Sequence, residues 1–126
     1  MSKSFGFFAI LALVVAVQLI QVEGVCTRIV ADCTAKNLSC PAVCKAVGSG
    51  AKLIGTNCDF YNLCTCTYDH EPYDIALCDI GMGLCTKDCR SDCCDAKCTG
   101  QYPKSGVGLC IHHFGLDYCR CTYRRP

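Results

Sequence analysis

The sequence predicts a small disulfide-rich α+β protein made of two tandem units, each with the element order β-α-β-β. Three observations support this fold class: 16 cysteines among 126 residues, an ordered cysteine pattern that occurs twice, and an N-terminus typical of secretion. A cysteine content above about 8–10% in a short secreted chain is typical of a disulfide scaffold. Cores of fewer than about 70–80 residues rarely supply more than about 3–5 kcal/mol, so units this small need covalent bridges.

The N-terminus has the order of a secretory signal peptide, which we assign to residues 1–24. Lys3 precedes an unbroken run of apolar residues and glycine over residues 5–17, and Gly24 is the small residue expected before the cleaved bond. The alternative is a membrane anchor, but a spanning helix needs about 20 apolar residues and this run is shorter. We therefore expect a secreted, extracellular protein whose mature form has no stable transmembrane anchor.

The internal repeat places unit 1 at residues 25–71 and unit 2 at residues 72–126, with a polar linker at 69–74. Each unit closes alike, on Cys64-Thr-Cys66-Thr-Tyr68 and on Cys119-Arg-Cys121-Thr-Tyr123. No two cysteines have CxxC spacing, which argues against the usual zinc-ribbon ligand pair and the thioredoxin-type redox pair. Unit 1 contains Cys26, Cys33, Cys40, Cys44, Cys58, Cys64 and Cys66; unit 2 contains Cys78, Cys85, Cys94, Cys98, Cys110, Cys119 and Cys121, with Cys89 and Cys93 in addition.

The cysteine spacings predict a helix bridged to a strand in each unit. Cys40 and Cys44, like Cys94 and Cys98, stand four residues apart and share one face of a helix. The two cysteines of each closing Cys-x-Cys share one face of a strand. A helix with two thiols along a stripe can therefore form two roughly parallel bridges to such a strand.

Local signals place the ends of these elements. Ser39 is expected to cap the first helix, with Pro41 in its first turn and glycines from Gly48 ending it. Ser91 or Asp92 is expected to cap the second helix, and Gly100 to lie just past its end. Strands are expected from residues 53–54 toward Cys58 and from 107–109 toward Cys110. Hairpin loops are expected at 59–63 and 111–118, and the first strand of each unit is expected to be short.

The order C…CxxxC…C…CxC resembles the cysteine-stabilised αβ motif of defensins, and with the signal peptide it resembles plant defensin-like proteins, as a tandem two-domain member. The resemblance implies the bridges Cys40–Cys64, Cys44–Cys66 and Cys33–Cys58, and likewise Cys94–Cys119, Cys98–Cys121 and Cys85–Cys110. It further implies that Cys26–Cys78 closes unit 1 and that Cys89 pairs with Cys93. Because thiols four apart on one regular helix do not usually bond each other, an exchange of roles between Cys89 and Cys85 stays open.

The Gly-x-Cys strand signature of the family is present in unit 2 as Gly108-Leu109-Cys110. In unit 1 the matching position is Thr56, and Gly55 lies one place early. Unit 2 is therefore the better match to the family.

The sequence contains no catalytic constellation and implies no cofactor, so we do not expect an enzyme. It has no phosphate-binding Gly-rich loop with its lysine, no HExxH motif and no GxSxG elbow. His112-His113 could suggest a metal site, but two loop histidines beside a bridged cysteine are the simpler interpretation, and no metal is expected. Asn37-Leu38-Ser39 is a glycosylation sequon, with Ser39 as helix cap the competing interpretation.

Charge is unevenly distributed along the chain. Residues 25–71 hold four cations and four acids, residues 72–96 hold two and five, and residues 97–126 hold five and one. The C-terminal hairpin is therefore predicted to form a basic pole with an apolar loop tip, suited to anionic lipid headgroups or to an acidic receptor surface. Its candidate binding residues are His112, His113, Phe114, Arg120, Arg124 and Arg125, with Lys97 and Lys104 nearby.

The predicted function is host defence, antifungal or antimicrobial, by non-catalytic binding to a microbial membrane lipid or cell surface. The alternative is a secreted signalling ligand for a cell-surface receptor, as in plant reproduction, which the near-neutral net charge of +1 favours. A protease or channel inhibitor presenting residues 111–118 is a third hypothesis. Nucleic acid is not an expected partner.

Overall fold

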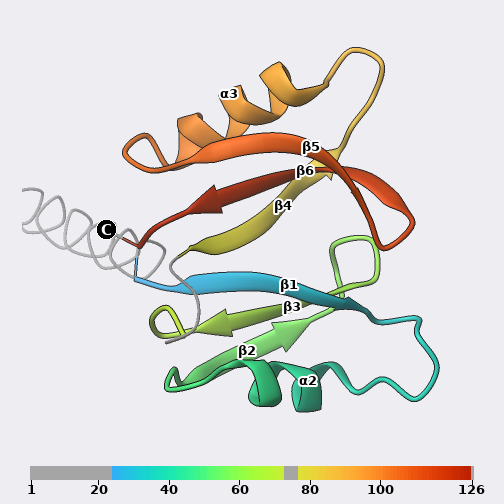
Figure 1. The fold of residues 1–126 in the computed structure, drawn as a ribbon, viewed down its shortest axis with the longest axis vertical. Helices are drawn as coiled ribbons and strands as arrows, with labels where there is room; N and C mark the ends of the chain where they lie inside the picture. The colour runs from blue at the N-terminus through green and yellow to red at the C-terminus, as the bar shows by residue number, and fades with distance from the viewer. Residues whose placement is uncertain (1–23, 73–76, 126) are drawn as a thin grey trace, which may run out of the picture.

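The computed structural model describes residues 24–72 and 77–125, and the predicted signal peptide lies outside them, apart from Gly24. Each unit has one helix and a three-stranded antiparallel sheet, so the predicted fold class of two tandem cysteine-stabilised αβ units is confirmed (Figure 1). The elements are β1 (Cys26–Asp32), α2 (Cys40–Val47), β2 (Leu53–Asn57), β3 (Leu63–Tyr68), β4 (Cys78–Leu84), α3 (Ser91–Gln101), β5 (Val107–His113) and β6 (Leu116–Tyr123).

The third strand of each unit lies in the middle of its sheet, in the orders β1-β3-β2 and β4-β6-β5. The first strands β1 and β4 each have 7 residues, so the expectation that they are short is wrong. Their length follows from pairing, because β1 runs against β3 from Cys26↔Tyr68 to Asp32↔Leu63. A central strand with two long neighbours gives each helix a sheet face on which to pack.

The first helix begins and ends where the sequence predicts. The Ser39 hydroxyl accepts a hydrogen bond from the Ala42 N–H at 3.4 Å, Pro41 lies in the first turn, and Gly48 is the C-cap residue. Gly48 also lies where a Cβ would come within 2.4 Å of the Tyr68 ring. The Tyr68 hydroxyl donates to the Cys44 carbonyl at 2.6 Å, which ties the end of α2 to β3.

The second helix differs from its sequence prediction at both ends. Arg90 is the N-cap residue and makes no side-chain capping bond, because the Ser91 hydroxyl instead accepts from the Cys110 N–H of β5 at 3.2 Å. Gly100 lies inside the helix, which continues to Gln101. Tyr102 follows as the C-cap residue and stacks on Tyr123 with ring centroids 3.9 Å apart, which holds the extra turn against β6.

Gly108 explains why α3 packs closely on β5. A Cβ at this position would lie 2.2 Å from the Cys94 carbonyl oxygen, so only glycine fits between strand and helix. Its N–H donates to the Asp95 carboxylate at 3.0 Å, which covers the outer edge of β5 with a helix side chain. The register Gly108↔Cys121 matches Thr56↔Cys66 in unit 1, where no such close approach is required.

The expected loop at 111–118 is wrong, because β5 and β6 meet in a two-residue turn. His113 pairs with Leu116, and the turn residues Phe114 and Gly115 have φ values of 54° and 75°. Positive φ at both central residues matches the twist of the two strands and makes a tight hairpin. His112 and His113 are therefore strand residues.

All 16 cysteines are bridged, in the eight pairs that the resemblance implies. Cys89 and Cys93 bond each other because Cys89 precedes α3, so the two are not stacked on one regular helix. Cys26–Cys78 joins the first residues of β1 and β4. It therefore links the two units, whereas the resemblance implied that it closes unit 1.

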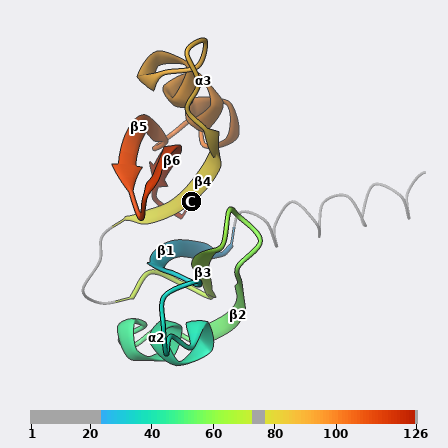
Figure 2. The same ribbon diagram turned by 90° about the vertical axis from the view of Figure 1, so that its right-hand side faces the viewer.

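The two units lie side by side along β1 and β4, with α2 and α3 on opposite outer sides (Figures 1 and 2). Side chains of unit 2 bond the outer edge of β1. The Thr27 N–H donates to the Tyr123 hydroxyl at 2.9 Å, and the Ile29 N–H donates to the Asp79 carboxylate at 2.8 Å. These contacts satisfy backbone groups that an exposed edge strand would leave free for other chains.

An apolar cluster fills the other end of the boundary. Ile29 and Leu63 of unit 1 are buried together with Tyr118 of unit 2. The Phe60 ring contacts Tyr118 edge-on, with centroids 5.7 Å apart, and lies where a Cβ on Gly81 would clash at 2.4 Å. The units thus share a core as well as a disulfide.

Candidate interaction surface

The predicted basic pole divides into two separate regions. His112, His113 and Phe114 lie at the closed end of the β5–β6 hairpin, whereas Arg124 and Arg125 follow the far end of β6. At about 3.4 Å per residue, the 8-residue strand β6 separates these groups by roughly 25 Å. One small ligand cannot contact both regions.

The closed end of the hairpin makes several contacts within the molecule. His112 Nδ1 lies 2.6 Å from the Asp117 carboxylate, and His113 stacks on Phe114 with ring centroids 3.9 Å apart. Phe114 and Leu116 pack against the buried cluster between the units. The apolar residues of the expected tip are therefore half-buried inner contacts, whereas His112 and His113 are exposed.

Arg125 is held by contacts with both ends of unit 1. Its Nε lies 3.2 Å from a Glu71 carboxylate oxygen, and its Nη1 donates to the carbonyls of Gly24 and Asp69 at 3.2 and 3.1 Å. Burial favours the protonated form of Glu71, but hydrogen bonds from backbone N–H groups and from the Arg125 guanidinium outweigh it and hold the pKa below 4.5. Arg125 therefore joins the two ends of the described chain, and we remove it from the candidate binding surface.

Arg120, Arg124 and Lys104 share a surface with two apolar residues that sequence reasoning missed, whereas Lys97 lies on α3. Leu109 lies opposite Arg120, and Val107 opposite Thr122, so these side chains share the face of the sheet away from α3. Val107 is 53% exposed and Leu109 is 47% exposed. Arg124 follows Thr122 by two residues and continues the same face. Its backbone forms hydrogen bonds with the Ser105 hydroxyl, and Lys104 precedes Ser105 in the chain. We call this set the β5–β6 patch: Lys104, Val107, Leu109, Arg120 and Arg124.

The sequence carries a signal that could have found the patch. In Val107-Gly108-Leu109 the glycine belongs to the helix-facing side, so period-two alternation places the two apolar residues on the opposite side. Unit 1 has Gly55 and Asn57 at the matching register positions, across from Thr67 and Thr65. The apolar and basic character is therefore particular to unit 2.

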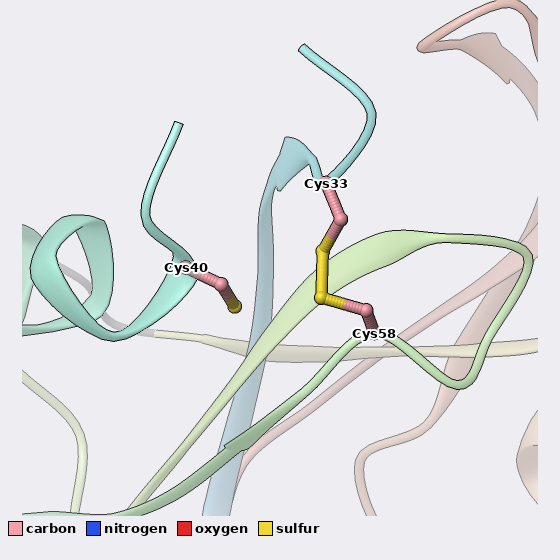
Figure 3. A group of neighbouring side chains, drawn as sticks. All are labelled: Cys33, Cys40 and Cys58. Atoms are coloured by element: carbon pink, nitrogen blue, oxygen red, sulfur yellow. A yellow bond between two sulfur atoms is a disulfide. The ribbon is translucent and has the colours of Figure 1, made fainter. Parts of the chain in front are cut away.

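Several groups of cysteine sulfurs lie close enough to resemble metal sites, such as Cys33, Cys40 and Cys58 (Figure 3). Cys33 and Cys58 are bonded to each other, and the sulfur of Cys40 is bonded to Cys64. A cysteine binds a metal as its thiolate, so bridged sulfurs are not available as ligands. The proximity reflects dense bridging.

The sequon residue Asn37 lies on the surface. Its side chain is exposed in the turn before α2, with a left-handed φ of 62°, while Ser39 caps the helix. Cap and sequon therefore use neighbouring residues without competing for one side chain, and modification of Asn37 stays a prediction.

In the two ranges that the structure describes, no helix has the length and apolar character needed to cross a membrane. Two units, each with a helix bridged twice to the central strand of its sheet, define the class: a tandem cysteine-stabilised αβ protein.

Three proteins of Arabidopsis thaliana are similar to this chain in sequence. The chain is 39% identical over 61 residues to defensin-like protein 181 of Arabidopsis thaliana, a match that covers 48% of each chain. It is 35% identical over 66 residues to defensin-like protein 182, covering 48% of this chain and 50% of the relative. The chain thus spans about half the length of these two relatives. A longer match, 28% identical over 103 residues, covers 78% of this chain and 76% of defensin-like protein 183.

No protein-family model matches the chain, and no solved structure matches it significantly. The three relatives confirm the resemblance to plant defensin-like proteins, and the structure shows a cysteine-rich protein of two bridged units.

Proposed function

We propose that the protein is a secreted host-defence protein that binds microbial membranes or cell surfaces without catalysis, through the β5–β6 patch. The observation that carries this proposal is the placement of exposed Leu109 directly opposite Arg120. A surface with apolar side chains among cations can insert shallowly at an anionic interface, where each cation near the membrane is worth about 1 kcal/mol. The defensin-like relatives support the same assignment.

The patch gives unit 2 a local field that the whole chain lacks. The formal net charge is only +1, and unit 1 is balanced, so bulk attraction to a membrane is weak. Attraction therefore depends on Arg120, Arg124 and Lys104 lying together. Arg120 is partly buried, whereas Arg124 and Lys104 are exposed, and salt screens exposed charges over about 8–10 Å.

The test compares two double charge reversals in the full mature chain. Arg120→Glu with Arg124→Glu is expected to abolish binding to anionic vesicles and to raise the concentration that inhibits fungal growth at least tenfold. Lys36→Glu with Lys45→Glu makes the same charge change on exposed residues of unit 1 and is expected to alter both by less than twofold. Equal losses in the two double variants would show that net charge acts alone, without the patch.

A signalling ligand is the second candidate, favoured by one feature of unit 2. Thr86 and Cys89 exchange two backbone hydrogen bonds of 3.1 Å, which makes a tight turn with exposed Lys87 and Asp88 at its tip. The bridges Cys85–Cys110 and Cys89–Cys93 flank this turn and hold it rigid. A rigid charged turn suits recognition of a specific receptor surface.

The two candidates predict different dose responses. Host defence predicts growth inhibition at low micromolar protein that weakens with added salt. Signalling predicts no inhibition, together with saturable nanomolar binding to one cell type that is lost in Lys87→Glu with Asp88→Lys, a pair that leaves net charge unchanged.

A further inference from the structure

The side chain of Arg120 has no hydrogen-bond or ion-pair partner among the residues that the structure describes. It lies in β6 between Gly81 of β4 and Leu109 of β5, on the face away from α3. Its Nε is buried without a hydrogen-bond partner, and no carboxylate of the described residues pairs with it. Arginine keeps its charge in proteins and offers five donors, and a buried donor left unbonded costs about 1–3 kcal/mol. Such a group in a native structure calls for an explanation, and a bound water or ion is one of those that apply.

A second such arginine approaches from the other unit. The Nε of Arg28 in β1 is also buried without a hydrogen-bond partner, and it lies 3.8 Å from the Asp79 carboxylate. That distance allows an ionic contact but exceeds a hydrogen bond. Arg28 and Arg120 are thus incompletely satisfied donors brought to the boundary by different units.

Asp79 connects the two arginines. One of its oxygens accepts from the Ile29 N–H at 2.8 Å, so the carboxylate is fixed in place. Burial raises the pKa of Asp79, although the Ile29 N–H and the charges of Arg28, Arg120 and His113 act to lower it. Asp79 pairs with Thr122 of β6, Arg120 stands two residues from Thr122 on the same face, and Arg28 approaches the carboxylate from β1. Two permanent cations therefore lie near one desolvated carboxylate, which leaves an excess of positive charge at this point.

The geometry points to an oxyanion site between the units, in which Arg120 and Arg28 bind a phosphate group. Guanidinium groups bind phosphate through two parallel N–H···O bonds, which are shorter and stronger than neutral hydrogen bonds. Exposed Leu109 and Val107 beside Arg120 suit a ligand whose phosphate is attached to an apolar part. In an anionic lipid, the phosphate belongs to the headgroup and the apolar part is the acyl chains. The identification of the ligand as a lipid rests on the proposed function, whereas the phosphate site itself does not.

The test titrates the isotopically labelled, disulfide-intact mature chain with inorganic phosphate and follows the backbone amide resonances. Saturable shifts are expected at residues around Arg28 and Arg120. Arg120→Gln and Arg28→Gln are each expected to weaken phosphate binding tenfold or more. Arg90→Gln removes the same charge from an exposed arginine and is expected to change it less than twofold. Unchanged spectra outside the boundary show that each variant is folded.

Vesicles distinguish a lipid headgroup from free phosphate as the ligand. Binding is compared between vesicles of phosphatidylcholine alone and vesicles that also contain about 30% phosphatidic acid, which represent an anionic leaflet. Parallel loss of phosphate and vesicle binding in Arg120→Gln and Arg28→Gln, but not in Arg90→Gln, supports a lipid headgroup. Loss of phosphate binding with unchanged vesicle binding supports a site for free phosphate and counts against the headgroup. Equal weakening in all three variants, or no saturable phosphate shift in the wild type, overturns the site.

Discussion

Gly108→Ala should destabilise unit 2 by about 2–4 kcal/mol. The new methyl would lie 2.2 Å from the Cys94 carbonyl oxygen and 2.7 Å from the Asp95 Cα, so strand and helix must separate by roughly 1 Å to reach ordinary contact. The helix resists because Cys94–Cys119 and Cys98–Cys121 tie it to β6. Overpacking of this kind costs about 1–3 kcal/mol, and the weakened bond from Gly108 N–H to Asp95 adds about 1 kcal/mol.

The assay is guanidinium unfolding with disulfides intact, followed by circular dichroism, and the matched control is Gly100→Ala. Gly100 lies in the same helix with no atom within 4 Å of an added Cβ. Alanine there should stabilise the helix by up to about 1 kcal/mol. Surface substitutions usually change the free energy of unfolding by less than about 0.5 kcal/mol. If the free energy of unfolding of Gly108→Ala lies within that range of the wild type, the close approach of α3 to β5 is wrong.

Three further outcomes follow from the boundary between the units. Tyr123→Phe removes the acceptor of the Thr27 N–H and should cost about 1–2 kcal/mol, with faster amide exchange at Thr27; unchanged exchange there would contradict the bond. A protease site engineered between Pro72 and Leu77 should yield fragments that stay joined on a non-reducing gel and separate only with reductant, because Cys26–Cys78 connects the units. The wild type should lose stability relative to Glu71→Gln as the pH falls below 4.5, since the lowered pKa of Glu71 favours the folded state only while the carboxylate is charged; parallel pH profiles would count against the Arg125 contact.

Elements set by neighbouring residues were predictable from the sequence. Ser39 and Pro41 mark the start of α2 because capping depends on residues a few positions apart. The end of α3 was not predictable in this way. Gly100 resembles a helix end, but the Tyr102–Tyr123 stack and the Cys98–Cys121 bridge come from a strand some 20 residues later and extend the helix past it.

Part of the candidate surface coincides with the binding residues predicted from the sequence, and their binding stays a prediction. Arg120 and Arg124 belong to the patch, whereas Arg125 is bound by Glu71 and the histidines lie at the opposite end of the hairpin. Linear charge counts cannot separate these cases, because the partner of Arg125 lies 54 residues away. The contacts between the units could not be predicted for the same reason. They depend on which strand edges meet, and no local sequence pattern encodes that pairing of edges.

The most direct test of the account compares fungal growth inhibition by Leu109→Ser and Ile54→Ser. The two side chains are similarly exposed, at 47% and 55%, but Leu109 belongs to the patch of unit 2 and Ile54 lies on β2 of unit 1. Leu109→Ser is expected to raise the inhibitory concentration severalfold, while Ile54→Ser is expected to leave it unchanged. Equal effects of the two substitutions, or a larger effect of Ile54→Ser, would contradict the claim that unit 2 carries the active surface.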